Sequence, residues 1–526
     1  MSSDDKKRPS RPVGRFRIGF LSLVQLVLVA VVFLALNFLS SQHHRPFDLS
    51  DDLGFTLSPS TVRYLQSDAI QQREDPVEMI VAFRADSPLF QLYDRLRPIA
   101  EEYDRLSGRK VRLSLIDPNR APDAAQKLMA DYGVVFNQDL VILDARSAEE
   151  RQTTDAKEPS PHVYVVKVED MTVFQVDQGG QRRPRGFLPE DALRAGLVRA
   201  VEGKPRPVWV LADKSDFSSE EQEGVWEVLK ANLVSQNILP ERVQFAGVEQ
   251  IPEEVAALAI VAPVYDFSPE ELRVLEEYWS RPRAALLVLT GAAEAPPRLR
   301  AFLTENGIRP RADRVVTKKG DTLQTAVIGR FTTGLEFMRD LWETSTVLEG
   351  RTRSLEVRES ADSIATLGYS AFTVLEAHKD YWGETDFGAE QVGFNPDEDY
   401  AAPAVGKVPP GQPAPPPRGL ALAAAVIRGN ATHEATAAEI SRMVVIANTD
   451  FLSPNNVRQA NLDFLASATN WLVHRETLSG EGPRNLRLYK LPLLEPQVAM
   501  INRINLLFVP LAFALIGAMV WASRRA

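Results

Sequence analysis

Cysteine is absent from the 526-residue chain. This excludes disulfides, thiolate-bound zinc and cysteine nucleophiles in one step. It leaves the compartment open, because a domain of this size can bury an adequate core without covalent cross-links. Histidine is also scarce, and the six histidines lack the i, i+4 or H-x-H spacing that brings ligands to one metal ion. We therefore expect no metal site and no cofactor.

Two signatures of nucleotide and ester chemistry are missing as well. Without a G-x-x-x-x-G-K-[ST] loop, the chain is not expected to bind or hydrolyse ATP by that route. The nearest approach to G-x-S-x-G is Gly368-Tyr369-Ser370-Ala371-Phe372, where phenylalanine replaces the glycine that the sharp turn needs. These absences predict that the protein is not an enzyme.

Basic residues are too few to balance the acidic ones. The chain holds 60 Lys and Arg against 70 Asp and Glu, and residues 18–523 hold 52 against 68. An acidic body of this kind argues against binding nucleic acid and against lying flat on anionic lipid.

Two charge-free apolar runs, residues 18–38 and 504–523, are present near the ends of the chain. Each has about the 20 residues that a helix needs to cross a bilayer. The basic tail 1–17 precedes the first run, and no small-x-small cleavage pattern follows it, so we expect a retained anchor. The basic residues beside the runs predict a two-pass membrane protein with both termini cytoplasmic and the large domain on the other side of the membrane.

Residues 46–180 alternate strand and helix patterns and predict a first α/β domain. The order β-α-β-α-β-β resembles a thioredoxin-like arrangement without its redox cysteines. We read residues 178–186 as a basic turn, a solvated loop rather than an anion site, followed by a linking helix. The expected strands are 77–83, 111–116 and 140–143, the helices are 92–106, 122–132 and 189–201, and the hairpin joins 163–168 to 172–176.

Residues 187–450 predict a second, larger α/β domain with a mainly parallel sheet covered on both faces. Residues 311–400 give no clear pattern, and 402–418, with seven prolines, predict a loop. A C-terminal helix at 461–472 and a membrane-proximal segment occupy 451–503. The expected strands are 208–211, 259–262, 286–289, 420–427 and 443–446, with a short one at 486–491, and the helices are 220–233, 268–279 and 297–306.

Four polar residues follow the expected parallel strands and are candidates for a ligand crevice: Asp213, Tyr265, Thr290 and Asp450. In open α/β sheets, ligands bind outside the carboxyl ends of the strands, where strand order reverses. The alternative is that Asp213 and Asp450 cap helices or hold turns, which short polar side chains do routinely.

Several short segments, taken in order with the two apolar runs, resemble the GldG-like auxiliary components of ABC transport systems, a family associated with gliding motility. These segments are Phe47-Asp48-Leu49-Ser50, Phe55-Thr56-Leu57-Ser58-Pro59, Ile116-Asp117-Pro118, Ala262-Pro263, Asp450-Phe451 and Asn470-Trp471-Leu472. The chain departs from the family at two turns. Ala212-Asp213-Lys214-Ser215 stands where members carry a Gly-His-Gly-Glu-like turn, and Ala447-Asn448-Thr449-Asp450-Phe451 stands where they have Gly-Asp-Ser-Asp-Phe.

The resemblance implies a second domain similar to class I glutamine amidotransferases or flavodoxin, inactive here without cysteine. It also implies a non-catalytic, membrane-anchored auxiliary subunit that works with an ABC permease and a separate ATPase. Such a subunit would lie in the bacterial inner (plasma) membrane with its large domain periplasmic. Gln25, Asn37 and Pro510 are candidates for contact with the permease, because polar residues at such depths prefer protein neighbours to lipid. The alternative function is a membrane-tethered sensor that binds a glycan or polymer in the crevice.

Overall fold

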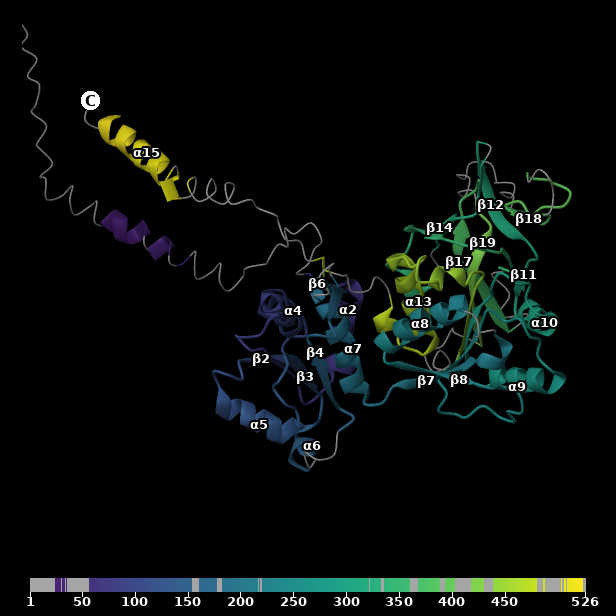
Figure 1. The fold of residues 1–526 in the computed structure, drawn as a ribbon, viewed down its shortest axis with the longest axis horizontal. Helices are drawn as coiled ribbons and strands as arrows, with labels where there is room; N and C mark the ends of the chain where they lie inside the picture. The colour runs from purple at the N-terminus through teal and green to yellow at the C-terminus, as the bar shows by residue number, and fades with distance from the viewer. Residues whose placement is uncertain are drawn as a thin grey trace, which may run out of the picture. The chain divides into compact units, whose positions relative to one another are not determined.

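The computed structural model describes residues 56–479 apart from 154–159, 177–181, 216, 218–219, 321, 333–334, 360–367, 388–392, 403–417 and 430–438. It also describes residues 24–29, 31–33, 35, 486–487, 503, 506–507 and 509–523. Residues 1–55 form one unit and residues 56–526 another, and all the described strands belong to the second. The chain is mixed α/β with parallel strands in its sheets (Figure 1).

The first sheet has the strand order β2-β1-β3-β4. β1 and β2 are parallel, whereas β3 is antiparallel to both β1 and β4. Alternate residues of β1 face opposite layers: Met79 and Val81 pack with α4 and α7, and Ile80 with α5. Figure 1 shows α4 and α5 on opposite sides of the strands. The bounds are β1 Val77–Ala82, β2 Val111–Ile116, β3 Leu140–Asp144, β4 Val163–Lys167, α4 Tyr93–Leu106, α5 Pro122–Tyr132 and α7 Pro189–Glu202.

The predicted hairpin between 163–168 and 172–176 is wrong. β4 pairs with β3, and β5 (Thr172–Val176) pairs with β6 (Arg182–Phe187), which includes much of the predicted basic loop. Pro184 is accommodated in β6 because the register shifts beside it, between Val173 and Phe174. β21 (Leu486–Arg487) adds the third strand of this small sheet.

The second sheet begins with five parallel strands in the order β8-β7-β9-β10-β20. Its central strands are buried along their whole length, as continuous apolar runs predict. Helices α8 and α13 pack on one face, and α9 and α10 on the other. The sequence analysis missed edge strand β8. The bounds are β7 Arg206–Leu211, β8 Ile238–Val243, β9 Ala257–Val261, β10 Ala285–Leu289, β20 Ser441–Ile446, α8 Glu220–Ser235, α9 Pro269–Ser280, α10 Pro297–Glu305 and α13 Gln459–Leu472.

The other half of this sheet is antiparallel, so the prediction of a mainly parallel sheet holds only for the first five strands. Strands β19, β17, β14 and β15 continue the order beyond β20, and β11 and β16 branch from β19. β12, β13 and β18 form a separate small sheet. The bounds are β11 Ile308–Pro310, β12 Arg314–Lys319, β13 Thr322–Gln324, β14 Val327–Phe331, β15 Ser345–Leu348, β16 Leu355–Val357, β17 Tyr369–Ala377, β18 Trp382–Glu384 and β19 Ala421–Arg428.

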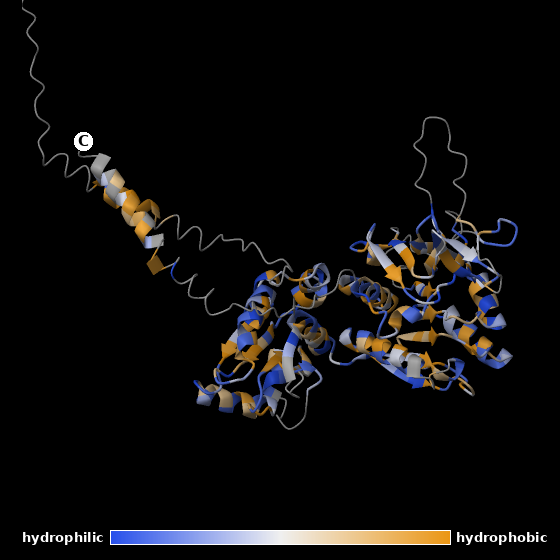
Figure 2. Cartoon of the chain, turned by 45° about the horizontal axis from the view of Figure 1, so that its top comes forward, coloured by the Kyte–Doolittle hydropathy of each residue, from blue (hydrophilic) through white to orange (hydrophobic). Residues whose placement is uncertain are grey.

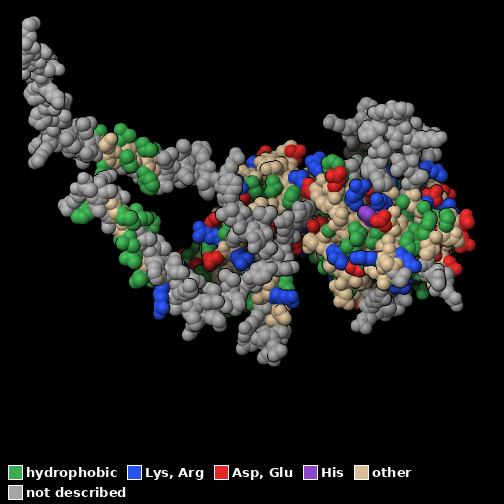
Figure 3. Space-filling view, turned by 90° about the horizontal axis from the view of Figure 1, so that it is seen from above, with side chains coloured by type: hydrophobic (Ala, Val, Ile, Leu, Met, Phe, Trp, Pro, Cys, Tyr) green, Lys and Arg blue, Asp and Glu red, His purple; other side chains and the backbone are tan. Residues whose placement is uncertain are grey.

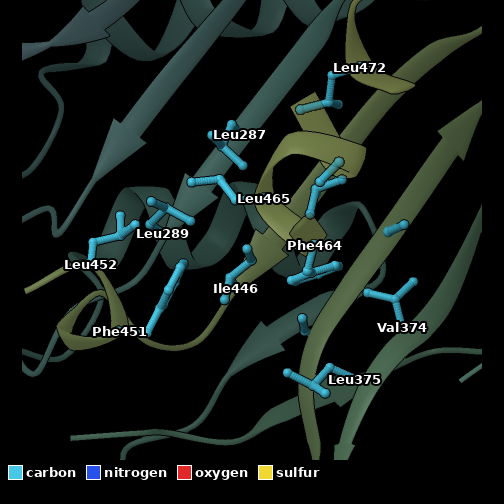
Figure 4. Packing of buried hydrophobic residues seen from close by; sticks show 14 of the residues in the cluster. Leu287, Leu289, Val374, Leu375, Ile446, Phe451, Leu452, Phe464, Leu465 and Leu472 are labelled. Carbon is cyan, nitrogen blue, oxygen red and sulfur yellow. The ribbon is translucent and has the colours of Figure 1, made fainter. Parts of the chain in front are cut away.

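The largest core cluster lies where α13 packs on the second sheet. Leu465 of α13 lies beside Leu287 and Leu289 of β10, and Phe464 lies in the same layer (Figure 4). Figure 2 shows the same pattern at larger scale, with hydrophobic residues concentrated on the strands and the inner sides of helices.

The remaining elements are short. Ser58 accepts a hydrogen bond from the backbone N–H of Thr61 and begins α2, as Ser58 followed by Pro59 predicts. Among the described residues, no helix has both the length and the apolar character to span a membrane. The bounds are α2 Pro59–Leu65, α3 Asp68–Gln71, α6 Ala148–Thr153, α15 Val509–Ser523 and the 3-10 turns η1 Phe90–Leu92, η2 Ala212–Lys214, η3 Glu336–Met338, η4 Asp450–Leu452 and η5 Glu476–Leu478.

Candidate functional site

The loop after β7 holds Asp213 in a structural role. Its carboxylate accepts hydrogen bonds from the backbone N–H groups of Phe245, at 2.8 Å, and Ala246, at 3.0 Å. These bonds tie the end of β7 to the segment after β8. Asp213 therefore joins two loops that are 32 residues apart in the chain.

Lys214, next to Asp213, is buried in an ion pair. Its Nζ lies 2.7 Å from Oε2 of Glu271 and 5.2 Å from the centroid of the Phe267 ring. Glu271 also accepts the backbone N–H of Ser268 in the capping box that begins α9. The Ser-Pro-Glu-Glu sequence predicts that cap, but nothing in it marks Lys214 as the second partner.

Strand order reverses between β7 and β9, which is where a doubly wound sheet would bind a ligand. The chain bridges this point itself. The carbonyl of Lys214 accepts the N–H of Val264 at 2.8 Å and of Tyr265 at 3.3 Å, and Ser215 forms an isolated antiparallel bridge with Pro263. The hydroxyl of Ser215 donates to the carbonyl of Val261. Tyr265 is left 58% exposed.

Thr290 and Asp450 lie at the ends of the next two strands. Thr290 is buried, and its N–H donates to the carbonyl of Ile446 at 2.8 Å. Asp450 accepts the backbone N–H of Arg351 at 2.8 Å. A Cβ on Gly350 (φ +82°) would lie 2.3 Å from Asp450 Oδ2, so only glycine allows this approach.

The segment that carries Gly350 also packs against the loops that follow β10 and β20. The side chain of Asn448, fully buried, donates to Thr352 Oγ1 at 2.7 Å and accepts from the N–H of Phe451 at 2.9 Å. Arg353 donates through its guanidinium to the carbonyl of Ala292 at 2.7 Å, and burial lowers the pKa of Arg353. Sequence reasoning missed both residues, because their partners are far away along the chain.

The four predicted crevice residues therefore follow four neighbouring strands at one edge of the sheet. Asp213, Thr290 and Asp450 use polar atoms of their side chains or backbone to hold the fold, and Tyr265 is the exposed member. Over the described part of the chain, no cluster of three His, Asp or Glu residues could hold a metal ion. On the face in Figure 3, acidic and basic side chains are intermixed.

The residues predicted to contact a permease are outside this edge. Gln25 is exposed and lies in the helical stretch 24–29, and Asn37 is outside the described residues. Pro510 is exposed in the first turn of α15, where proline removes no helical hydrogen bond.

The chain resembles known proteins only in part. A domain of unknown function (DUF7088) matches residues 52–156. No curated protein matches the sequence. Among solved structures, the mmIFT52 N-terminal domain is similar with 13% identity and a TM-score of 0.32, over 50% of this chain and 96% of that one. A putative thua-like protein from Bacteroides uniformis ATCC 8492 has 11% identity and a TM-score of 0.30, over 53% and 95%. The exo-beta-1,4-mannosidase Op5Man5 from Opitutaceae bacterium strain TAV5 has 11% identity and a TM-score of 0.26, over 74% and 50%.

Proposed function

We propose that this protein is a non-catalytic, membrane-anchored auxiliary subunit of an ABC-type transport system, similar to GldG. A separate ATPase and a polytopic permease would power and form the transporter. The domains between the two apolar runs would lie on the periplasmic side and bind a partner or the transported substrate.

We also propose a thioredoxin-like fold for the first domain and a flavodoxin-like or amidotransferase-like fold for the second. The strand order β2-β1-β3-β4, with one parallel pair followed by antiparallel strands, supports a thioredoxin-like first domain. The order β8-β7-β9-β10-β20 is 2-1-3-4-5 in chain sequence, which supports a flavodoxin-like or amidotransferase-like sheet in the second.

One observation carries the non-catalytic reading, namely that the backbone itself closes the switch point between β7 and β9, where a doubly wound sheet does its chemistry. The backbone bridges the switch point between Ser215 and Pro263, and Lys214 is held by Glu271. A nucleophile needs a base within hydrogen-bond reach and an open site beside it. Ser215 instead donates to a backbone carbonyl.

The two-pass topology rests on the sequence. Two runs of about 20 apolar residues and the basic residues outside them support anchoring at both ends. Such tethering would raise the effective concentration of the domains at a transporter. Gln25, Asn37 and Pro510 remain the proposed contacts with the permease.

Affinity purification of the full-length chain from detergent-solubilised membranes tests this proposal. We expect an ATPase and a polytopic permease to co-purify in fixed ratio. A matched chain with residues 18–38 replaced by an unrelated single-span anchor should stay in the membrane but lose the permease. A lone monodisperse protein would contradict the proposal.

One observation favours the glycan-binding alternative. Exposed Tyr265 lies between two residues that line a cavity of about 760 Å3, Val264 and Asp266. An exposed ring beside polar groups suits stacking against a sugar. If this alternative is correct, Tyr265→Ala abolishes oligosaccharide binding, whereas Trp342→Ala, at another exposed aromatic residue, leaves it unchanged.

A further inference from the structure

A second cavity, of about 680 Å3, lies at the opposite, amino-terminal edge of the parallel sheet. Its size is within the range of small-molecule sites. The residues that precede or begin β7, β9 and β10 contribute to it, together with the segment after α13. Val255, Ala256 and Tyr278 also line it, and Val255 and Tyr278 are buried. Its basic lining residues are Arg206, Arg281, Arg283 and His474.

Two of these lining residues adopt the left-handed backbone conformation. Arg283 has φ 61° and His474 has φ 58°. His474 follows the C-cap Val473 of α13, and the bonds from Arg475 N to Asn470 O and from His474 N to Trp471 O form a Schellman motif. Glycine is the usual residue at this position, because a Cβ disfavours the left-handed conformation. Strained residues that meet at one cavity point to a function for their side chains.

The imidazole of His474 also has an unsatisfied polar atom. Its Nε2 is buried and has no hydrogen-bond partner among the described residues. Burial lowers the pKa of His474 to about 4, with further lowering by Arg442, Arg283 and Arg206, so the ring is neutral near pH 7. A buried polar atom without a partner costs free energy unless something binds to it.

Positive charge at the cavity is only partly neutralised by the protein. Arg206 pairs with Glu202, and Arg281 donates to the carbonyl of Ile251. Within the described part of the chain, Arg283 has no ion pair. The acidic lining residues Glu253 and Glu254 are exposed, and so is Arg283, so water screens all three charges.

We propose that this cavity binds the oxyanion group of a small molecule, a phosphate or a carboxylate, through Arg281, Arg283 and His474. The guanidinium groups supply charge-assisted hydrogen bonds, and the neutral imidazole, protonated at Nε2, supplies one N–H once a change of rotamer brings this buried atom to the cavity surface. Val255 and Ala256 contact the rest of the ligand. This inference is independent of the transport proposal, because it concerns the other edge of the sheet.

Isothermal titration calorimetry on the full-length protein in detergent tests it. The titrants are inorganic phosphate and citrate near neutral pH, with the ionic strength fixed by NaCl. Binding of phosphate alone assigns a phosphate group, and tighter binding of citrate assigns a carboxylate. Either result supports the site if the variants below behave as expected.

We expect Arg283→Gln to weaken the Kd about tenfold or more, because it removes a charged donor. His474→Asn keeps a residue type that tolerates the left-handed conformation and should weaken the Kd about fivefold without loss of folding. Arg273→Gln removes an exposed arginine that pairs with Glu277 on α9 and is the matched control. Failure of both anions to bind overturns the proposal, as does an equal effect of Arg273→Gln and Arg283→Gln.

Discussion

The two edges of one parallel sheet differ in how their polar groups are used. At the carboxyl edge, Asp213, Asp450 and Asn448 make short hydrogen bonds to backbone groups, and Lys214 is paired with Glu271. At the amino edge, the His474 imidazole has a buried nitrogen without a partner. Ligands usually bind at the carboxyl edge of such sheets. In this chain the polar side chains that follow these strands hold the fold, whereas the amino edge combines a cavity with an imidazole nitrogen that lacks a partner among the described residues.

The largest expected effect comes from breaking the buried ion pair of the carboxyl edge. Lys214→Ala leaves Glu271 buried without its partner and should destabilise the protein by about 3 kcal/mol or more. Arg273→Ala breaks an exposed pair with Glu277 and should cost less than about 0.5 kcal/mol. Denaturant unfolding, followed by tryptophan fluorescence, measures both. Equal small effects would mean that Lys214 is not a structural residue.

Gly350 offers a second test of the same edge. Gly350→Ala places a Cβ against the Asp450 carboxylate in a left-handed backbone conformation, and we expect a loss of about 2–3 kcal/mol. Gly320→Ala is the control, because Gly320 has φ +62° but open space around it. It should cost only about 1 kcal/mol. The difference between the two unfolding free energies isolates the contact with Asp450, and a difference near zero would contradict it.

The amino edge predicts a dependence of stability on pH. The folded-state pKa of His474 is about 4, below the unfolded value of about 6.5, so the unfolded state binds more protons between these values. The contribution of neutral His474 to the free energy of unfolding is therefore fully present above about pH 6.5 and is lost as the pH falls toward 4. After discounting for solvent, we expect His474 to account for about 1–2 kcal/mol of this loss.

Comparing denaturant unfolding of His474→Asn with the native chain across this range isolates the contribution. His378→Asn is the control, because His378 is exposed and salt-bridged only to Asp380 in the described residues. If His474→Asn and the native chain lose the same stability on acidification, the burial of a neutral imidazole is disproved.

The smallest expected change in the free energy of unfolding is a stabilisation. His474→Gly relieves the left-handed conformation after α13 and should stabilise the protein by about 0.5–1 kcal/mol while weakening anion binding. Thermal unfolding and calorimetry on the same sample test this. A destabilised variant would show that the side chain contributes to packing more than to a site.

Four of the five parallel strands of the second sheet could be predicted, because β7, β9, β10 and β20 contain continuous apolar runs. The N-caps Ser58 and Ser268 are also local features, since each is a serine followed by proline at the first helical position. Most strands of the antiparallel half were not predicted, because β11, β14, β15 and β16 have only three to five residues each and β11–β16 and β14–β17 join segments that are far apart in the chain. β6 was missed because its proline and arginines are typical of a loop, and a register shift at Val173 accommodates them.

The sequence could predict which edge of the second sheet the candidate residues lie on, but not what they contact. Position after a strand placed Asp213, Thr290 and Asp450 correctly at one edge, but not their hydrogen bonds to distant backbone groups. Neither could the sequence reveal the amino-edge cavity, because Arg283 and His474 meet there from segments far apart in the chain. Their left-handed backbone has no marker in residue type.

Affinity purification of the full-length chain from solubilised membranes, with quantitative mass spectrometry, tests the central claim most directly. If the protein is a non-catalytic auxiliary subunit, an ATPase and a polytopic permease are recovered in fixed ratio to it. Ser215→Ala then changes neither their recovery nor transport. Recovery of the protein alone, or loss of transport by Ser215→Ala in a folded protein, would contradict a non-catalytic auxiliary subunit.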